Sequence, residues 1–145
     1  MGKKQQWMDL VKAKSQHYLN LGDGGFDEKM KAHLVECDYE AQTVTYAFPT
    51  QTWQINEKGD IHGGAIAGMF DTAFGMVANF TTGENEATTT GMTVSFLRGV
   101  DYGMTLHLKV FIVKAGRSLI RQQAELTDAA TGKLLAAASG SWMPL

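Results

Sequence analysis

The stretch NEKGDIHGGAIAGMFDTAFGMVANF, residues 56–80, determines how the rest of the chain is organised. A polar turn and a His-Gly-Gly segment precede a segment whose apolar positions go all the way round a helical wheel. Such a helix is expected to be enclosed by other structure rather than to lie on a surface. Its one ionisable residue is Asp71. Because acids are almost never fully buried unless they are paired or used, Asp71 is the first candidate for function.

Length and composition are those of one ordinary globular domain, which we expect to span residues 1–145 with residues 1–25 as a helical extension. A formal net charge of -2 offers no general attraction to nucleic acid or to a membrane surface. The single cysteine, Cys37, excludes an internal disulfide and fits a reducing compartment. Neither a signal-peptide pattern nor a long apolar span is found, so we expect a cytoplasmic protein.

Strand patterns occupy most of the chain outside residues 56–80. A rough amphipathic helix is predicted over residues 5–19, before a glycine-rich segment. Most of the remaining segments are rich in β-branched and aromatic residues or alternate between apolar and polar positions, the last one is rich in small residues, and turn signals separate them. The predicted strands are residues 29–38, 42–50, 88–97, 106–113, 118–128 and 134–143.

One helix is long and apolar enough to cover the inner face of a sheet built from these strands. We therefore predict an α+β fold in which a curved antiparallel sheet of about six strands wraps around one central helix. The last three strands are close enough in sequence to form a meander.

The His62-Gly63-Gly64 turn leads into the start of the central helix. Backbone N–H groups there lack intrahelical partners, and the helix dipole adds partial positive charge. Such an end suits an anion, or a carbonyl oxygen that becomes an oxyanion during acyl transfer. The alternative is that these residues form only a tight loop and a flexible helix start.

Asp71 lies seven residues after Gly64, which is two helical turns and about 10 Å along the axis. A general base must come within about 3 Å of its proton or act through one water. Both groups can therefore serve one reaction only if the helix start of one subunit meets Asp71 of another in a two-fold dimer. Burial would raise the pKa of Asp71, as a base often requires. The alternative is a structural acid bonded to a hydroxyl or to the partner chain.

Other candidates for chemistry are weaker. The histidines, Cys37 and the serines match no pattern of a metal site or hydrolase triad, and the glycines match no nucleotide-binding fingerprint. Arg98, Lys114 and Arg117 are expected at strand ends or turns, where they either bind phosphates at the mouth of a pocket or only keep the surface solvated. Phe74 either lines a channel for an acyl group or packs in the core.

Several motifs occur together in residues 30–143: Asn56, His62-Gly63-Gly64, Asp71 with Gly75, and the later segments TTTGMTVSFLR, VKAGRSL and AELTDAATGKLLAAASGSW. With these motifs the chain resembles the hotdog-fold acyl-CoA thioesterases of the phenylacetate-degradation (PaaI-like) type. The resemblance implies a curved sheet around a long helix, dimers whose sheets join edge to edge, and frequent pairing of dimers into tetramers.

The same resemblance implies roles for individual residues. The acid at Asp71 would be a general base for water or a nucleophile, and Asn56 would hold substrate or water. His62 and the backbone N–H of Gly63 would polarise the thioester carbonyl. A hydroxyl on the following strand would orient the water, and Thr89 is its counterpart, with Thr90 as the alternative.

The sequence therefore predicts an acyl-CoA thioesterase without metal or redox cofactor, with coenzyme A entering between subunits. One alternative is a hydratase or dehydratase on the same fold. Those families place a catalytic histidine in a proline-containing loop and the acid farther along the helix, and this sequence has neither. Another is a non-catalytic acyl-CoA or lipid-binding protein. The acyl group is left open.

Overall fold

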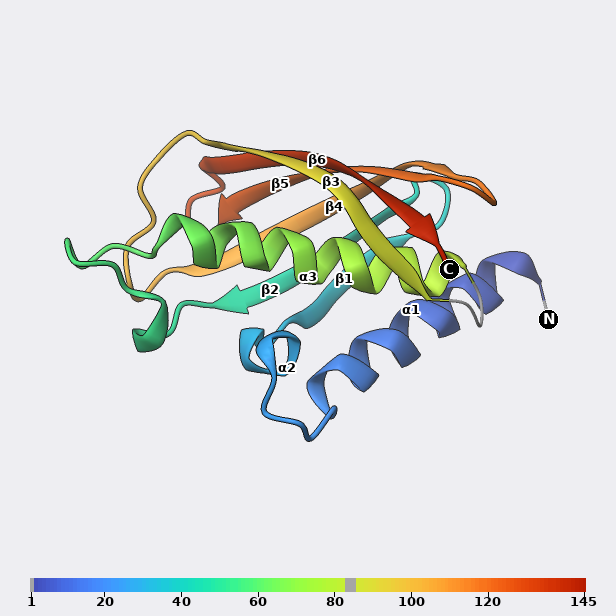
Figure 1. Ribbon diagram of the computed structural model, residues 1–145, viewed down its shortest axis with the longest axis horizontal. Helices are drawn as coiled ribbons and strands as arrows, with labels where there is room; N and C mark the ends of the chain where they lie inside the picture. The colour runs from blue at the N-terminus through green and yellow to red at the C-terminus, as the bar shows by residue number, and fades with distance from the viewer. Residues whose placement is uncertain (1, 83–85) are drawn as a thin grey trace.

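The computed structural model describes residues 2–82 and 86–145. In chain order its elements are α1 (Lys3–Leu19), α2 (Phe26–Met30), β1 (His33–Asp38), β2 (Thr43–Pro49), a 3-10 turn (Thr52–Gln54), α3 (Gly63–Thr81), β3 (Ala87–Phe96), β4 (Thr105–Ala115), β5 (Ile120–Asp128) and β6 (Leu134–Pro144). The six strands form one antiparallel sheet in the order β1-β2-β4-β5-β6-β3, which curves around α3 (Figure 1). The predicted fold class and the β4-β5-β6 meander are both confirmed.

The side of α3 that faces the sheet holds the core. Phe70 and Phe74 are fully buried there, and the Phe74 ring packs 4.7 Å from that of Trp142 on β6. Gln122 on β5 donates from Nε2 to the Phe74 carbonyl oxygen at 3.1 Å. Burying a large apolar side chain is worth about 2 kcal/mol, so this row of side chains holds the helix against the sheet.

Helices α1 and α2 cover the flank of α3 nearest β1 (Figure 1). Residues 29 and 30, predicted as the start of a strand, belong instead to α2. The physical reason is a local cap, because the Glu28 carboxylate accepts the backbone N–H groups of Gly22 and Gly24 ahead of the helix. Lys31 then ends the helix in a left-handed conformation with φ 54°.

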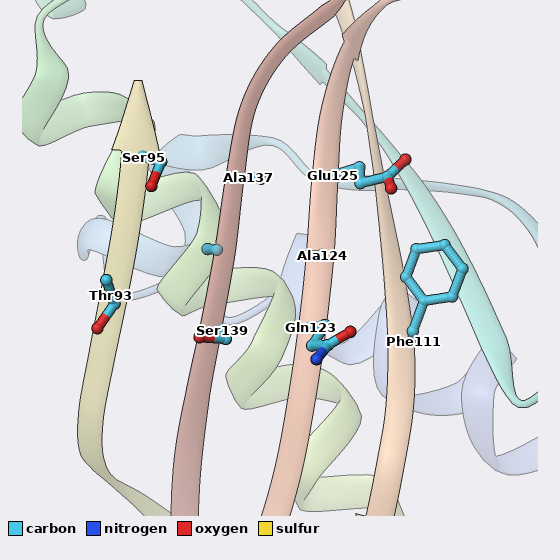
Figure 2. A pocket seen from close by; sticks show the side chains of 9 residues that line it. Thr93, Ser95, Phe111, Gln123, Ala124, Glu125, Ala137 and Ser139 are labelled. Carbon is cyan, nitrogen blue, oxygen red and sulfur yellow. The ribbon is translucent and has the colours of Figure 1, made fainter. Parts of the chain in front are cut away.

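The outer face of the sheet, opposite α3, carries small and polar side chains along its middle. Thr93 and Ser95 on β3 lie beside Ala137 and Ser139 on β6, with α3 behind the strands (Figure 2). They line an open hollow of about 390 Å³. Among the helices of the described part of the chain, none is long and apolar enough to cross a membrane.

Candidate active site

The start of α3 presents two hydrogen-bond donors. His62 is the N-cap, and its Nδ1 accepts the Gly64 N–H at 2.8 Å. Ala65 and Ile66 donate to the His62 carbonyl oxygen, whereas within residues 2–82 and 86–145 no hydrogen bond uses the Gly63 N–H. Because Nδ1 accepts, the hydrogen-bond network places the proton of a neutral His62 ring on Nε2. The Gly63 N–H and the His62 Nε2–H are therefore the donors available to a ligand, and the Gly64 N–H is engaged in the cap.

Asn56 stands beside this helix start. Its Oδ1 accepts the backbone N–H groups of Lys58 and Asp60 at 2.9 and 3.1 Å, which orients the amide and leaves Nδ2 as a donor. Asn56, Lys58, Gly63 and Arg98 share a cavity of about 340 Å³. The predicted cluster at the helix start is thus brought together, and Lys58 adds a second cation that the sequence patterns did not single out.

Asp71 lies on the side of α3 that faces away from the sheet and is exposed in a single chain. Its Oδ1 accepts a hydrogen bond from Thr89 Oγ1 on β3 at 2.8 Å. We expected Asp71 to be buried, and for a single chain this is wrong. Gly64, Gly68 and Gly75 lie on the same side of α3 and lack the side chains that would cover the carboxylate. Asp71 and Thr89 are nevertheless hydrogen-bonded, as the family resemblance implied.

Thr90 faces away from Asp71. A bulge in β3 between Thr89 and Gly91 shifts the register against β6, and the Thr90 hydroxyl donates to the Ser141 carbonyl oxygen at 3.0 Å. Of the two hydroxyls that the sequence left open, Thr89 is therefore the one that contacts the acid.

Three further predicted residues lie away from both clusters. Phe74 is fully buried in the core and lines none of the cavities found in the described residues, so its packing alternative holds. Lys114 lies near the end of β4, where it pairs with Arg121 on β5, and Arg117 lies in the turn between the two strands, whereas Arg98 follows β3 at the opposite end of the sheet. The three cations therefore do not form one phosphate site within a single chain.

Helix α1 reaches the Asp71 side of α3 through Tyr18. Asn79 donates from Nδ2 to the Tyr18 hydroxyl oxygen at 3.0 Å, and its own Oδ1 accepts the Ala87 N–H. Burial raises the pKa of Tyr18, and the carboxylates of Asp27, Glu86 and Asp71 raise it further. The sequence patterns did not single out this contact, since it joins residues 61 positions apart.

A further cavity of about 550 Å³ lies between α2 and the 3-10 turn, and the exposed rings of Phe26 and Trp53 line it. Sequence patterns missed Phe26 as well, because its position depends on how α2 packs. The described residues include no group of three or more His, Cys, Asp or Glu side chains placed to hold a metal ion.

Solved structures show the same fold at low sequence identity. Zebra fish thioesterase superfamily member 2 is 21% identical, with a TM-score of 0.80 over 93% of this chain and 97% of that chain. The Escherichia coli PaaI protein of the phenylacetic acid degradation operon is 18% identical, with a TM-score of 0.76 over 93% and 96%. A Streptococcus mutans protein bound to acetyl CoA is 21% identical, with a TM-score of 0.70 over 79% and 89%.

These neighbours confirm the hotdog fold. No curated protein sequence matches the chain. The sequence profile of the thioesterase superfamily matches residues 58–134, which extend from the loop before His62 to the start of β6 and include both Gly63 and Asp71. The chain therefore belongs to the thioesterase superfamily.

Proposed function

We propose that the protein is an acyl-CoA thioesterase whose active site is formed by two copies of the chain. One copy supplies the N–H donors at the start of α3 that bind the thioester carbonyl. The other copy supplies the acid, Asp71. Gly64 and Asp71 are seven residues apart on α3, about 10 Å along the axis, so one copy cannot apply both halves to one carbonyl.

The observation that carries the proposal is that Asp71 and the helix start both contact β3, which is an unpaired edge strand of the sheet. Asp71 is bonded to Thr89 near one end of the strand, and the Phe96 ring at the other end lies against Gly63, 3.6 Å from the position that a Cβ would take. An edge strand of ten residues offers unpaired N–H and C=O groups to another chain. The other edge, β1, is shorter, with six residues, and α1 packs against it.

Two β3 strands that pair antiparallel about Thr93 would bring the halves together. Residues 91, 93 and 95 then face the outer side in both copies, with residue 91 opposite residue 95. The bulge at Thr90 skips one position, so Thr89 lies opposite Phe96 of the other copy and both face α3. Asp71 of one copy thereby stands next to Gly63 of its neighbour.

The proposed reaction uses these groups in order. The carbonyl oxygen of the thioester accepts hydrogen bonds from the Gly63 N–H and the His62 Nε2–H, which stabilise the oxyanion. Asp71 takes a proton from a water that Thr89 and Asn56 hold, and the water oxygen attacks the carbonyl carbon. The C–S bond then breaks, and the departing thiolate receives the proton from Asp71. Attack by Asp71 itself, followed by hydrolysis of the anhydride, is the variant of this mechanism.

The products are a carboxylic acid and coenzyme A, and the reaction needs no metal or redox cofactor. We place the phosphates of coenzyme A near Lys58 and Arg98, because both cations border the cavity beside Gly63.

The activity is tested by measuring thiol release from a panel of acyl-CoAs, alongside the hydration of crotonyl-CoA. We expect thiol release, and a loss on the order of 100-fold in Asp71→Asn but not in the exposed control Asp9→Asn. Hydration without thiol release would favour the hydratase alternative. Binding without either reaction would favour a non-catalytic acyl-CoA-binding protein.

The shared site is tested with two variants that are inactive alone. Gly63 is the first helical residue and His62 is extended with ψ 138°, so Gly63→Pro keeps the helix while it removes the N–H donor. Mixed with Asp71→Asn, it should restore about a quarter of wild-type activity, because half of the dimers are mixed and each has one intact site. Gly63→Ala, which keeps the N–H, is the matched control, and an inactive mixture would contradict the shared site.

The register is tested by cross-linking. In a Cys37→Ser background, Thr93→Cys places two thiols opposite each other across the two-fold axis, within reach of a disulfide. Ser95→Cys, on the same face of the same strand (Figure 2), places them four residues apart in register and should not cross-link. Equal cross-linking of both variants would contradict pairing about Thr93.

A further inference from the structure

The exposed rings of Phe26 and Trp53 form an apolar pocket beside the start of α3. Phe26 is 51% exposed and Trp53 49%, and the two rings meet edge to face at 6.3 Å. Together with Lys29, Lys31 and Gln51 they line the cavity of about 550 Å³. Large exposed aromatic surface is costly in water, and where it lines a cavity it indicates a binding site.

The pocket is built from fixed parts rather than from a loose loop. Thr72 on α3 donates to the Asp27 carboxylate at 2.7 Å, which ties α2 to the helix next to Phe26. Gln51 donates from Nε2 to the Lys29 carbonyl oxygen at 2.7 Å, which joins the two walls of the pocket. Met30, fully buried, anchors the other end of α2. The two rings are therefore held in place before any ligand arrives.

Both walls of the pocket also touch the proposed reaction site. The tip of the Phe26 ring lies directly on Gly68, where a Cβ would come within 2.3 Å of its Cζ. Gly68 lies between the helix start and Asp71, about 6 Å along the axis from Gly64 and about 4.5 Å from Asp71. On the other wall, the residue after Trp53 accepts the His62 N–H at 2.7 Å through its carbonyl oxygen.

We infer that this pocket receives the acyl group of the thioester, and that the chemical class it takes is an apolar acyl chain of medium length. The inference rests on the proposed function, which holds the carbonyl at Gly63 and sends coenzyme A toward Lys58 and Arg98. We place the acyl group on the other side of the carbonyl, where the Phe26 ring lies on Gly68. None of the five lining residues is acidic, and the lysine stems extend the apolar wall.

Phe26 and Trp53 are therefore specificity-determining residues. A long apolar chain covers their rings and removes that surface from water, whereas an acetyl group is too short to reach them. Because each methylene group transferred from water is favourable, discrimination between acyl groups grows with chain length.

The test separates binding from hydrolysis by using the Asp71→Asn protein, in which hydrolysis of acyl-CoAs is expected to be on the order of 100-fold slower. Calorimetric titration should show octanoyl-CoA binding at least tenfold more tightly than acetyl-CoA. Trp53→Ala and Phe26→Ala in that background should weaken octanoyl-CoA binding at least tenfold and acetyl-CoA binding less than threefold. Trp53→Leu and Phe26→Leu, which keep apolar bulk at both walls, should retain part of the preference and show that the loss is not one of folding.

Phe111→Ala, which removes a ring from the outer face of the sheet (Figure 2), is the matched control and should leave the ratio of the two affinities unchanged. Variants at Phe26 and Trp53 that keep the octanoyl preference, or that lose both ligands equally, would overturn the inference. If the preference depends on the two rings but the wild-type protein releases no thiol from any acyl-CoA, the pocket stands and the proposed hydrolysis fails.

Discussion

The two sides of α3 differ in the size and in the exposure of their side chains. The side toward the sheet carries large side chains such as Phe70 and Phe74, which are fully buried. The side away from it carries Gly64, Gly68, Asp71 and Gly75, all exposed or partly exposed. The first side holds the fold together. The second leaves backbone and carboxylate uncovered. One helix can therefore supply both the core and the proposed reaction site, because large and small residues alternate with the helical period.

The largest effect is expected from emptying the buried side. Phe74→Ala removes a ring that packs against Phe70 and Trp142, so we expect a loss of about 3–5 kcal/mol in the free energy of unfolding. Urea denaturation followed by circular dichroism measures it. Asp71→Asn on the other side should change the free energy of unfolding by less than about 1 kcal/mol. Equal losses in the two variants would remove the distinction between the sides.

A smaller effect is expected at the border between the sides, where Thr72 is 3% exposed and donates to Asp27. Asp27→Ala leaves a buried hydroxyl without its acceptor, which should cost about 2 kcal/mol in the free energy of unfolding. The double variant Asp27→Ala with Thr72→Val should recover most of that loss, since neither partner then remains unsatisfied. If the loss in the free energy of unfolding of the double variant equals the sum of the losses of the two single variants, α2 is held in another way.

On the exposed side, the hydroxyl of Thr89 is expected to matter for rate rather than for stability. Thr89→Val keeps the shape and removes the hydrogen bond to Asp71, which should lower kcat/KM for acyl-CoA hydrolysis about tenfold. Thr89→Ser retains the hydroxyl and should retain most of the rate. The hydroxyl of Thr90, one residue away, donates to the Ser141 carbonyl oxygen, so Thr90→Val should have a kcat/KM close to that of wild type. A larger loss of rate in Thr90→Val than in Thr89→Val would assign the catalytic hydroxyl to Thr90.

The smallest effect concerns the pH dependence of the buried region. Burial raises the pKa of Tyr46, a fully buried residue of β2. Because the pKa of Tyr46 is higher in the folded than in the unfolded protein, the folded state favours the neutral phenol. The free energy of unfolding is therefore at its full value below the unfolded pKa of about 10, and it falls as the pH rises above that value. Between pH 9 and pH 11 we expect a loss of about 1 kcal/mol in wild type and a smaller one in Tyr46→Phe. An alkaline loss of the same size in both proteins would assign it to other groups.

Much of the fold could be predicted because it depends on local patterns. The apolar run within residues 56–80 predicted α3, and alternation or residue composition predicted each strand to within a few residues. Residues 29 and 30 are the exception, since the Glu28 cap that makes them helical spans a glycine-rich segment whose conformation no periodicity encodes.

For the candidate site, sequence reasoning identified the pair of Asp71 and Thr89 and the cluster of Asn56, His62 and Gly63. Sequence reasoning expected a buried Asp71 and left Phe74 as a candidate for substrate contact. The reason is that apolar residues all round a helix do not indicate which of its faces the tertiary structure leaves exposed to solvent. Sequence reasoning also missed Phe26, whose ring reaches Gly68 only through the packing of α2.

The sequence by itself determined that one apolar helix carries a single acid two turns after a His-Gly-Gly start, since helical spacing follows directly from residue number. Only the tertiary structure decided that β3 is an open edge, that a bulge in β3 sets the side to which Thr89 points, and that the ring of Phe26 reaches Gly68 on α3. These features depend on contacts between residues far apart in the chain, and such contacts form only when the whole core packs together.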